Sequence, residues 1–445
     1  MDLTADAAQS TVAGADTSMD GVSPVDTPSD HRRLRACIVC LPAGPLAGLT
    51  AAAAFGGTEV RAWTLAKGLA AVGVDVTFLV RGDRPARSVV NGVTVRVLPE
   101  PMYARYVFVG RHVERTARFP LIRVRRWSPT LLWRLPIVAA HRLLCGPPGA
   151  IGVAAAVKKC GADVVLPFGV QSTARLVIDA CNAAGIPTAL AIGCDDDLDM
   201  RYRDDPAFVN PYGDSAATCL AALTGATAVL VQTPSQAKAL RERFGRKGVV
   251  LPNPVDGRLW NPTLTPAPPP GVESGYVLWV GRAEPVHKRP ALCLEIAARC
   301  PGRRFLMVLN PADTQTEADI QVRAGENVTI IPGIPPEQMP GVFAAAGCLL
   351  NTSAVEGFPN TYLQAAAVGV PIASLVVLPE WLTQFGAGQC FGGDLDAAAK
   401  WIEALPPEAR TTGRDPLLAT HEVSSVSRRL AAILRQITAR FPDGP

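Results

Sequence analysis

The sequence lacks the features that mark secreted and membrane-spanning proteins. None of its apolar runs reaches the roughly 18 uninterrupted residues that a membrane-spanning helix needs. Its first 30 residues carry six Asp and no Lys or Arg, whereas a signal peptide starts with basic residues and continues with an apolar segment. We therefore expect residues 1–33 to form a disordered acidic tail and the protein to be cytoplasmic.

Cysteine and histidine are present, but not in patterns that indicate disulfides or a metal site. The eleven cysteines are odd in number and irregularly spaced, which argues against a disulfide framework and for a reducing compartment. Cys37 and Cys40 form a C-x-x-C motif within the strand-like run ACIVCL, so we expect buried core residues rather than redox chemistry. The five histidines have no metal-ligand spacing, and we expect no metal site.

Short apolar strands alternate with helical patterns along most of the chain, as in LRACIVCL, GGTEVRAWTLAKGLAAVG and DVTFLV. Such alternation predicts parallel sheets covered by helices, and 445 residues suit two domains. The Pro-rich segment 261–275 predicts a linker between domains at 34–260 and 276–418, with a cleft between them. An amphipathic helix follows within 419–445. Its apolar stripe consists of Val426, Leu430, Ile433 and Ile437.

Residues 101–145 differ from the rest in charge. They contain nine Arg and a single acid, Glu114, among which aromatic residues are interleaved. This pattern is typical of a surface that binds an anionic membrane. It is equally compatible with a solvated basic face whose aromatic side chains belong to the core. Single-stranded nucleic acid is a third possibility that we do not favour, and we expect no nucleic-acid partner. The aromatic residues are Tyr103, Tyr106, Phe108, Phe119, Trp127 and Trp133.

Gly56 and Gly57 lie between the first predicted strand and the first predicted helix. Paired glycines allow a ligand to approach the backbone, and the following helix start offers N–H groups to an anion. The full G-x-G-x-x-G pattern is absent, which argues against a dinucleotide-dependent enzyme.

Two cations follow the strand YVLWVG at the start of the second domain. Arg282 comes directly after the strand, and Lys288 follows six residues later. Two cations that converge on one strand end suit a diphosphate, which arginine grips through a planar fork and lysine as a point charge. The alternative is a surface ion pair between Arg282 and Glu284.

A third stretch, EGFPNTYLQ, follows the strand GCLLNTS. Pro359 suits the first helical turn, which would leave the N–H groups of Asn360, Thr361 and Tyr362 free for a phosphate. A carboxylate beside a phosphate would repel it, so we expect Glu356 to reach past the phosphate towards sugar hydroxyl groups. The alternative is that Glu356 merely caps the helix.

The acidic run GCDDDLD follows the strand PTALAI. It is similar to a D-x-D metal clamp, but three successive aspartates cannot all face one ion, and such clamps belong to a single-domain architecture. Asp195 remains a candidate for substrate contact.

Together the segments GGTEV, VGRAEPVHK, QTPSQAKAL, LPNPVD and EGFPNTYLQAAAVGVP resemble the retaining GT-B glycosyltransferases of family GT4, from about residue 34 to the end. The resemblance implies two Rossmann-like domains, with the last helix crossing back to the first. It also implies that Arg282 and Lys288 neutralise the donor diphosphate and that Glu356 contacts donor hydroxyl groups. The implied donor-contacting residues are Gly56, Gly57, Gly281, Gly357, Phe358, Asn360, Thr361 and Gln364.

Two positions depart from the family pattern. Gln364 stands where the second acid of the E-x7-E motif holds the nucleotide ribose, so a charge-assisted hydrogen bond is replaced by a weaker neutral one. No histidine is present beside Gly193, Cys194 and Asp195, where the family often has one. These departures are expected to alter donor binding or acceptor positioning.

The function that these expectations support is transfer of a sugar from a nucleotide-sugar donor to a glycan or lipid-linked acceptor, with retention and without a metal or other cofactor. The basic 101–145 segment would hold the protein on the inner face of the cytoplasmic membrane. Two alternatives stay open: a nucleotide-sugar or glycan-binding protein derived from a transferase, and a nucleotide-sugar epimerase.

Overall fold

The computed structural model describes residues 32–48, 56–82, 84–100, 102–115, 122–124, 126–145, 150–210 and 212–441. The acidic tail predicted for residues 1–33 lies outside these ranges except for its last two residues, and so does Phe119. None of the helices within the described ranges is long and apolar enough to cross a membrane.

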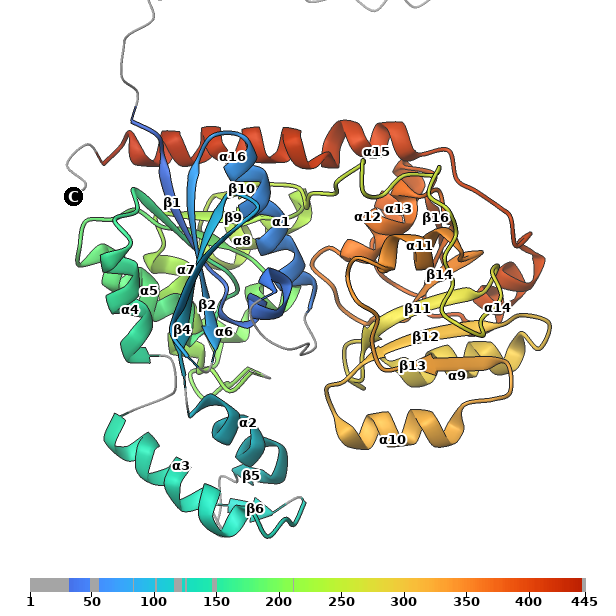
Figure 1. The fold of residues 1–445 in the computed structure, drawn as a ribbon, viewed down its shortest axis with the longest axis horizontal. Helices are drawn as coiled ribbons and strands as arrows, with labels where there is room; N and C mark the ends of the chain where they lie inside the picture. The colour runs from blue at the N-terminus through green and yellow to red at the C-terminus, as the bar shows by residue number, and fades with distance from the viewer. Residues whose placement is uncertain are drawn as a thin grey trace, which may run out of the picture. The chain divides into compact units, whose positions relative to one another are not determined.

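The first domain is built on parallel strands in the orders β3-β4-β2-β1-β7 and β10-β9-β8 (Figure 1). Isolated parallel bridges from Val165 to Thr188 and from Phe168 to Ala191 connect the two groups. Within these two groups of described strands, β3 at the edge runs antiparallel to its neighbour β4. The strands are β1 Arg35–Val39, β2 Asp75–Gly82, β3 Ala86–Val90, β4 Val93–Pro99, β7 Val164–Pro167, β8 Ala189–Ala191, β9 Ala228–Val231 and β10 Gly248–Val250.

Alternation along β1 explains the layers of this domain. Ala36 and Ile38 face a core that includes α1, whereas Cys37 and Val39 face a second core that includes α4 and α5. Cys37 is therefore a buried strand residue, as expected for this C-x-x-C motif. The helical segments are η1 Leu41–Ala47, α1 Gly57–Ala71, α4 Ala150–Lys159, α5 Ser172–Asn182, η2 Asp195–Leu198, α6 Arg201–Asp204, α7 Ala216–Gly225 and α8 Pro234–Phe244.

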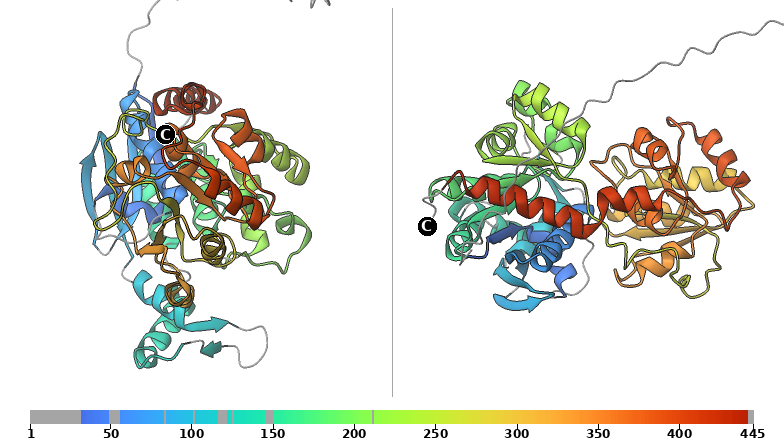
Figure 2. Two further views of the ribbon diagram at one scale, coloured as in Figure 1. Left: turned by 90° about the vertical axis from the view of Figure 1, so that its right-hand side faces the viewer. Right: turned by 90° about the horizontal axis from the view of Figure 1, so that it is seen from above.

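The described residues between 102 and 145 form a small unit of their own between β4 and α4, apart from the sheet in both Figure 1 and Figure 2. Its core joins Val109 of one helix to Leu131 and Val138 of another. This unit consists of α2 Tyr103–His112, β5 Val113–Arg115, β6 Ile122–Val124 and α3 Leu131–Cys145.

The second domain is one parallel sheet in the order β13-β12-β11-β14-β15-β16. Leu278 and Val280 of β11 face one helical layer, and Val277 and Trp279 face the other. The strands are β11 Val277–Arg282, β12 Phe305–Asn310, β13 Val328–Ile331, β14 Cys348–Asn351, β15 Ile372–Ser374 and β16 Gly388–Cys390. The helices are α9 Pro290–Arg299, α10 Thr314–Arg323, α11 Met339–Ala344, α12 Asn360–Ala367, α13 Pro379–Gln384 and α14 Leu395–Ala404.

The chain ends in two consecutive helices, α15 (Arg414–His421) and α16 (Val423–Thr438). Leu417 of α15 belongs to a core of the second domain, whereas the apolar stripe of α16 packs into the core of the first (Figure 1). The final helix thus returns to the first domain, and the expected two-domain GT-B architecture is confirmed.

Candidate active site

Strand β11 carries Gly281 and Arg282 to the carboxyl edge of the second sheet, as predicted. Gly281 is buried, and a Cβ there would come within 2.7 Å of the Trp279 indole. The same indole donates a hydrogen bond of 2.9 Å from Nε1 to Oγ1 of Thr352, just beyond β14. The absence of a side chain at Gly281 therefore lets β11 pack closely beside the segment that leads to Glu356.

The Arg282 side chain is exposed and has no hydrogen bond or ion pair with any part of the chain that the structure describes. The alternative pairing with Glu284 is not observed, because that carboxylate accepts bonds from the N–H groups of His287 at 2.6 Å, Val286 at 2.9 Å and Lys288 at 3.2 Å. Desolvation raises the pKa of the Tyr212 phenol, although the residue is 57% exposed, and the charge of Arg282 opposes that rise. The charge of Arg282 therefore acts on a residue of the first domain.

Lys288 and Glu356 form an ion pair between Nζ and Oε1. The same Oε1 accepts a 2.7 Å hydrogen bond from the hydroxyl of Ser353. The side chains are 26% and 16% exposed, so water still reaches both. From the sequence, Lys288 was expected to bind a phosphate and Glu356 a sugar. The ion pair between these two side chains was not expected.

Arg289 connects the loop that contains Lys288 to the loop that contains Glu356. Its guanidinium donates to the carbonyl oxygens of Thr352 at 2.7 Å and Ser353 at 3.0 Å. Its own backbone lies in the left-handed region, with φ at 49°. A non-glycine residue in this conformation is uncommon and is held here by the surrounding hydrogen bonds. Arg289 escaped notice in the sequence because nothing in its spacing separates it from Lys288.

Helix α12 begins one residue later than expected. Pro359 is its N-cap, with φ −67° and ψ 117°, and the helix runs from Asn360. The expectation of three free N–H groups was wrong for Tyr362, whose N–H donates to the carbonyl of Pro359 at 3.0 Å. The N–H groups of Asn360 and Thr361 remain the candidate phosphate donors at this helix start.

The side chain of Asn360 connects α12 to the first domain. Its Nδ2 donates to the carbonyl of Gly57 at 2.7 Å, and its Oδ1 accepts from Nδ2 of Asn253 at 3.0 Å. Asn253 also donates to the carbonyl of Phe358 at 3.2 Å. The structure therefore brings together Gly57 and Asn360, two residues that the resemblance assigned to donor contact. Asn253 of the LPNPVD segment, for which the sequence predicted no role, joins the two.

The Gly56–Gly57 helix start has a carboxylate of its own. Glu59 accepts a 2.9 Å hydrogen bond from the N–H of Gly56. A Cβ at Gly56 would lie 2.8 Å from Oε2 of Glu59, so glycine permits this cap. The N–H of the N-cap Gly56 is thus already bonded by Glu59, while the use of the first N–H groups of the helix itself by an anion stays a prediction.

Gly357 and Phe358 hold the loop after Glu356 in place. A Cβ on Gly357 would come within 2.8 Å of Cα of Cys194, so this loop fits closely against the loop after β8. The ring of Phe358 is buried and packs against Trp381 and His421, with ring centroids 5.4 and 5.3 Å away. Phe358 therefore contributes its side chain to the core rather than to a ligand surface.

The three aspartates after β8 turn towards different partners. Asp195 accepts from Nε2 of Gln236 at 2.8 Å, and Asp197 accepts from the N–H groups of Gly193 at 2.6 Å and Val170 at 3.2 Å. Burial raises the pKa of Asp197 to about 6 and raises that of Asp195 as well. The prediction that successive aspartates would not share one ion agrees with this divergence.

Asp196 is the aspartate that meets the second domain. Its Oδ2 lies 3.5 Å from Nδ1 of His287. The sequence has no histidine beside Gly193, but the fold brings His287 to this loop from the segment between Arg282 and Lys288. Only the tertiary structure reveals this neighbour.

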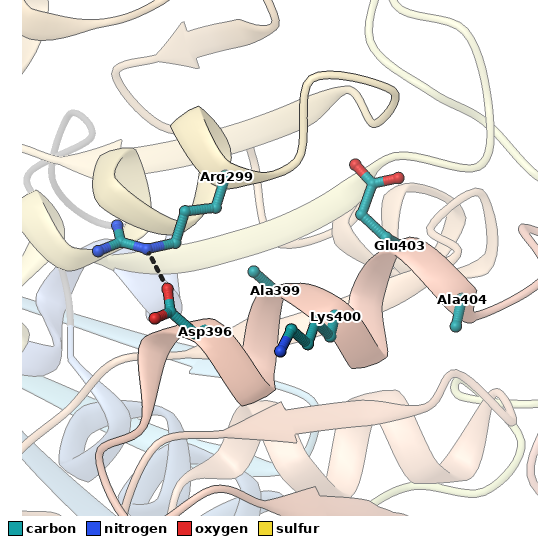
Figure 3. A pocket seen from close by; sticks show the side chains of 6 residues that line it. All are labelled: Arg299, Asp396, Ala399, Lys400, Glu403 and Ala404. Atoms are coloured by element: carbon teal, nitrogen blue, oxygen red, sulfur yellow. Dashed lines mark hydrogen bonds and ion pairs between the residues drawn. The ribbon is translucent and has the colours of Figure 1, made fainter.

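Gln364 lies half-buried in the second turn of α12, with no hydrogen bond from its side chain to the described residues. A separate hollow of about 570 Å³ opens between α9 and α14 (Figure 3). An ion pair between Arg299 and Asp396 closes one end of it, with Nε to Oδ1 at 2.8 Å. None of the predicted site residues lines this hollow, so the chemistry is assigned to the sheet edge.

Comparison with known proteins agrees with this architecture. Residues 56–254 match the model of the glycosyl transferase 4-like domain, and residues 274–405 match that of the glycosyl transferases group 1. A segment of 144 residues is 30% identical to the D-inositol 3-phosphate glycosyltransferase of Mycolicibacterium paratuberculosis. That segment spans 30% of this chain and about a third (32%) of the length of the curated relative.

Solved structures resemble the chain over nearly its whole length. The sucrose-phosphate synthase of Thermosynechococcus elongatus is 18% identical, with a TM-score of 0.63 over 92% of this chain and 100% of that one. Anabaena HepE, solved in complex with UDP and glucose, is 15% identical, with a TM-score of 0.61 over 91% of this chain and 100% of that one. From the two family models and the GT-B architecture, the chain belongs to the GT4 glycosyltransferases.

Proposed function

We propose that this glycosyltransferase moves a sugar from a nucleotide-sugar donor to a glycan or lipid-linked acceptor, with retention at the anomeric carbon and without a metal. The observation that carries the proposal is the position of the Lys288–Glu356 pair. A cation for a diphosphate and a carboxylate for hydroxyl groups meet beside the start of α12. Arg282 lies at the end of the neighbouring strand β11.

The donor diphosphate would bind through Arg282, Lys288 and the first N–H groups of α12. Negative charge grows on the leaving phosphate oxygen as the bond to the anomeric carbon breaks. Two cations and a helix start at one sheet edge would stabilise that charge once the donor is bound. In this proposal they supply the charge that a metal supplies elsewhere.

Donor binding would change the partner of Lys288. A diphosphate that binds its ammonium would release Glu356, whose carboxylate is then free to accept hydrogen bonds from sugar hydroxyl groups. Ser353 continues to hold one carboxylate oxygen during this exchange. Glu356 thus serves as a counter-ion in one state and as a sugar ligand in the other.

The acceptor hydroxyl would attack from the face that the diphosphate leaves, and its proton would pass to the departing phosphate oxygen. The reaction then needs no separate general base. The group that receives the proton is the one that Arg282 and Lys288 hold in place.

Arg282→Ala tests the assignment. Loss of one preorganised donor typically lowers the rate by about 10²–10³-fold, and we expect kcat with the best donor of a nucleotide-sugar panel to fall at least that far. The fold should survive, because the guanidinium has no hydrogen bond to the described residues. Arg299→Ala is the matched control, since it removes an arginine of the same domain that lies on the hollow between α9 and α14. Unchanged turnover in Arg282→Ala would remove the diphosphate from this strand end.

A second candidate is a binding protein derived from a transferase. Gln364 in place of the second acid favours it, because the ribose hydrogen bond is then neutral and weaker. Incubation with a panel of nucleotide sugars, followed by separate detection of binding and of released nucleotide, distinguishes the two. Affinity without turnover would favour the binding protein.

A further inference from the structure

The exposed apolar side chains of this protein concentrate in the unit of α2, β5, β6 and α3 (Figure 1). Half of the large hydrophobic residues that are exposed in the described part of the chain fall between Tyr103 and Leu144, although this segment is about a tenth of the chain. Large apolar patches on a water-soluble surface mark binding sites rather than chance exposure.

Helix α3 concentrates this surface on one side. Leu131 and Val138 face inward and pack with Val109 of α2. The opposite side presents large apolar residues at helical spacing, so that they share one face. They are Leu132, Trp133, Ile137, Leu143 and Leu144, and we call them the outer face of α3.

The apolar residues of the outer face are highly exposed. Leu143 is 87% exposed, Leu144 84% and Leu132 70%. Trp127 in the preceding turn and Ile122 and Val124 in β6 extend the same apolar character beyond the helix. Exposed apolar side chains therefore occur in α3, in β6 and in the turn between them.

The segment that carries this apolar surface is rich in positive charge. The segment 101–145 has nine Arg and one acid. Arg123 in β6 and Arg142 in α3 are exposed, and Arg134 lies with its guanidinium carbon 4.9 Å from the centre of the Trp133 ring. Cations beside inserted aromatic and aliphatic side chains complement an anionic lipid surface, where each arginine interacts with negative headgroups.

We propose that the outer face of α3 docks on an anionic membrane surface, with α3 parallel to the plane of the bilayer. At 15 residues the helix is too short to span the apolar core of a bilayer. Its leucines and tryptophan would enter the headgroup boundary while the flanking arginines contact anionic lipid. This inference deepens the proposed function and rests on it only for its purpose, which is to place the active site at a lipid-linked acceptor.

Flotation with vesicles tests the docking without any nucleotide sugar. The full chain is mixed with vesicles of phosphatidylglycerol and phosphatidylcholine, or of phosphatidylcholine alone, at low and high salt. We expect flotation with the anionic vesicles and a marked loss at high salt, because exposed charges are screened. The double variant Leu143→Ser/Leu144→Ser should bind at least about tenfold more weakly, since it removes the most exposed apolar groups. Arg142→Gln should weaken binding to anionic vesicles by about fivefold.

Matched controls separate the patch from general changes in hydrophobicity and charge. Val322→Ser removes a side chain that is 86% exposed on α10, and Lys238→Gln removes an exposed cation on α8. Both should float like the unmodified protein.

Two outcomes would overturn the docking. One is an unmodified chain that stays at the bottom of the gradient at low salt, and the other is a double serine variant that floats as well as the parent. A concentration-dependent increase in size that the double variant abolishes, without vesicle binding, would instead assign the face to a second copy of the chain. A protein that floats but transfers no sugar would support the docking and contradict the proposed function, so the two fail separately.

Discussion

Lys288→Ala separates the two roles that the Lys288–Glu356 pair has in this structure. As an ion pair the residues stabilise the fold, and as a site they would bind the donor. Measured pairs range from about 0–1 kcal/mol when exposed to about 3–5 kcal/mol when one partner of a buried pair is removed. The side chains here are 26% and 16% exposed, so we expect the free energy of unfolding to fall by about 1–2 kcal/mol.

A loss of that size does not account for a large loss of activity. Domains are commonly stable by about 5–15 kcal/mol, so a variant weakened by 1–2 kcal/mol remains almost entirely folded. If the ammonium stabilises the leaving diphosphate, kcat should nevertheless fall by about 10²–10³-fold. The loss of kcat would then come from weaker transition-state stabilisation and not from unfolding of the variant.

The assay combines denaturant unfolding, followed by tryptophan fluorescence, with steady-state transfer from the best donor of a nucleotide-sugar panel. Lys238→Ala is the control, because its pair with Glu242 is 3.9 Å long and both side chains are more than half exposed. It should change neither quantity appreciably. A kcat within threefold of the parent in Lys288→Ala, together with the expected loss of stability, would reduce this pair to a structural contact.

Glu356→Gln gives the reciprocal result. The amide keeps an oxygen for the Ser353 hydroxyl but no longer competes with a diphosphate for the Lys288 ammonium. We expect a nucleoside diphosphate to bind more tightly in a calorimetric titration while sugar transfer falls. Weaker diphosphate binding would contradict the exchange of partners.

Two further predictions concern residues outside this pair. If the ribose lies at this turn of α12, Gln364→Glu should tighten nucleotide binding, because a carboxylate restores a charge-assisted hydrogen bond. Unchanged nucleotide affinity by calorimetry would place the ribose elsewhere. Asp197 has a folded-state pKa raised to about 6 by burial, above its ordinary value, so its stabilising contribution is greatest in acid and is lost as the pH rises to 6. Between pH 4 and 7 the free energy of unfolding of the parent should fall by about 2 kcal/mol more than that of Asp197→Asn. Denaturant titrations that give the same change for both proteins would refute the assignment.

The sequence predicted the fold where local patterns determine the structure. The apolar runs ending at Val39, Val231 and Asn351 each became a buried strand, because a strand covered on both faces is continuously apolar. The edge strand Ala86–Val90 was missed, since its side chains are largely exposed and carry no such signal. The same reasoning explains why residues 101–145 yielded a charge pattern but no elements.

The candidate site could be predicted as far as strand order allows. Arg282 and Glu356 follow neighbouring parallel strands, so their convergence on one sheet edge was predictable. The hydrogen-bond partner of each group was not predictable, because a hydrogen bond depends on which groups lie within about 3 Å in the folded chain and not on their separation in sequence. The contact of His287 with Asp196 joins residues from different domains, and no spacing rule in one dimension could find it.

The placement of glycine links these two kinds of information. Gly281 and Gly357 were both predicted to contact the donor. Each also has a structural reason to be glycine, because a side chain would collide with a neighbouring group. That group is the indole of Trp279 at Gly281 and the backbone of Cys194 at Gly357. At both glycines, the segment that carries the charged residue packs closely against its neighbour: β11 with Arg282 and the loop with Glu356. The glycines therefore help to fix the positions of the charged residues. Their predicted contact with the donor stays a prediction.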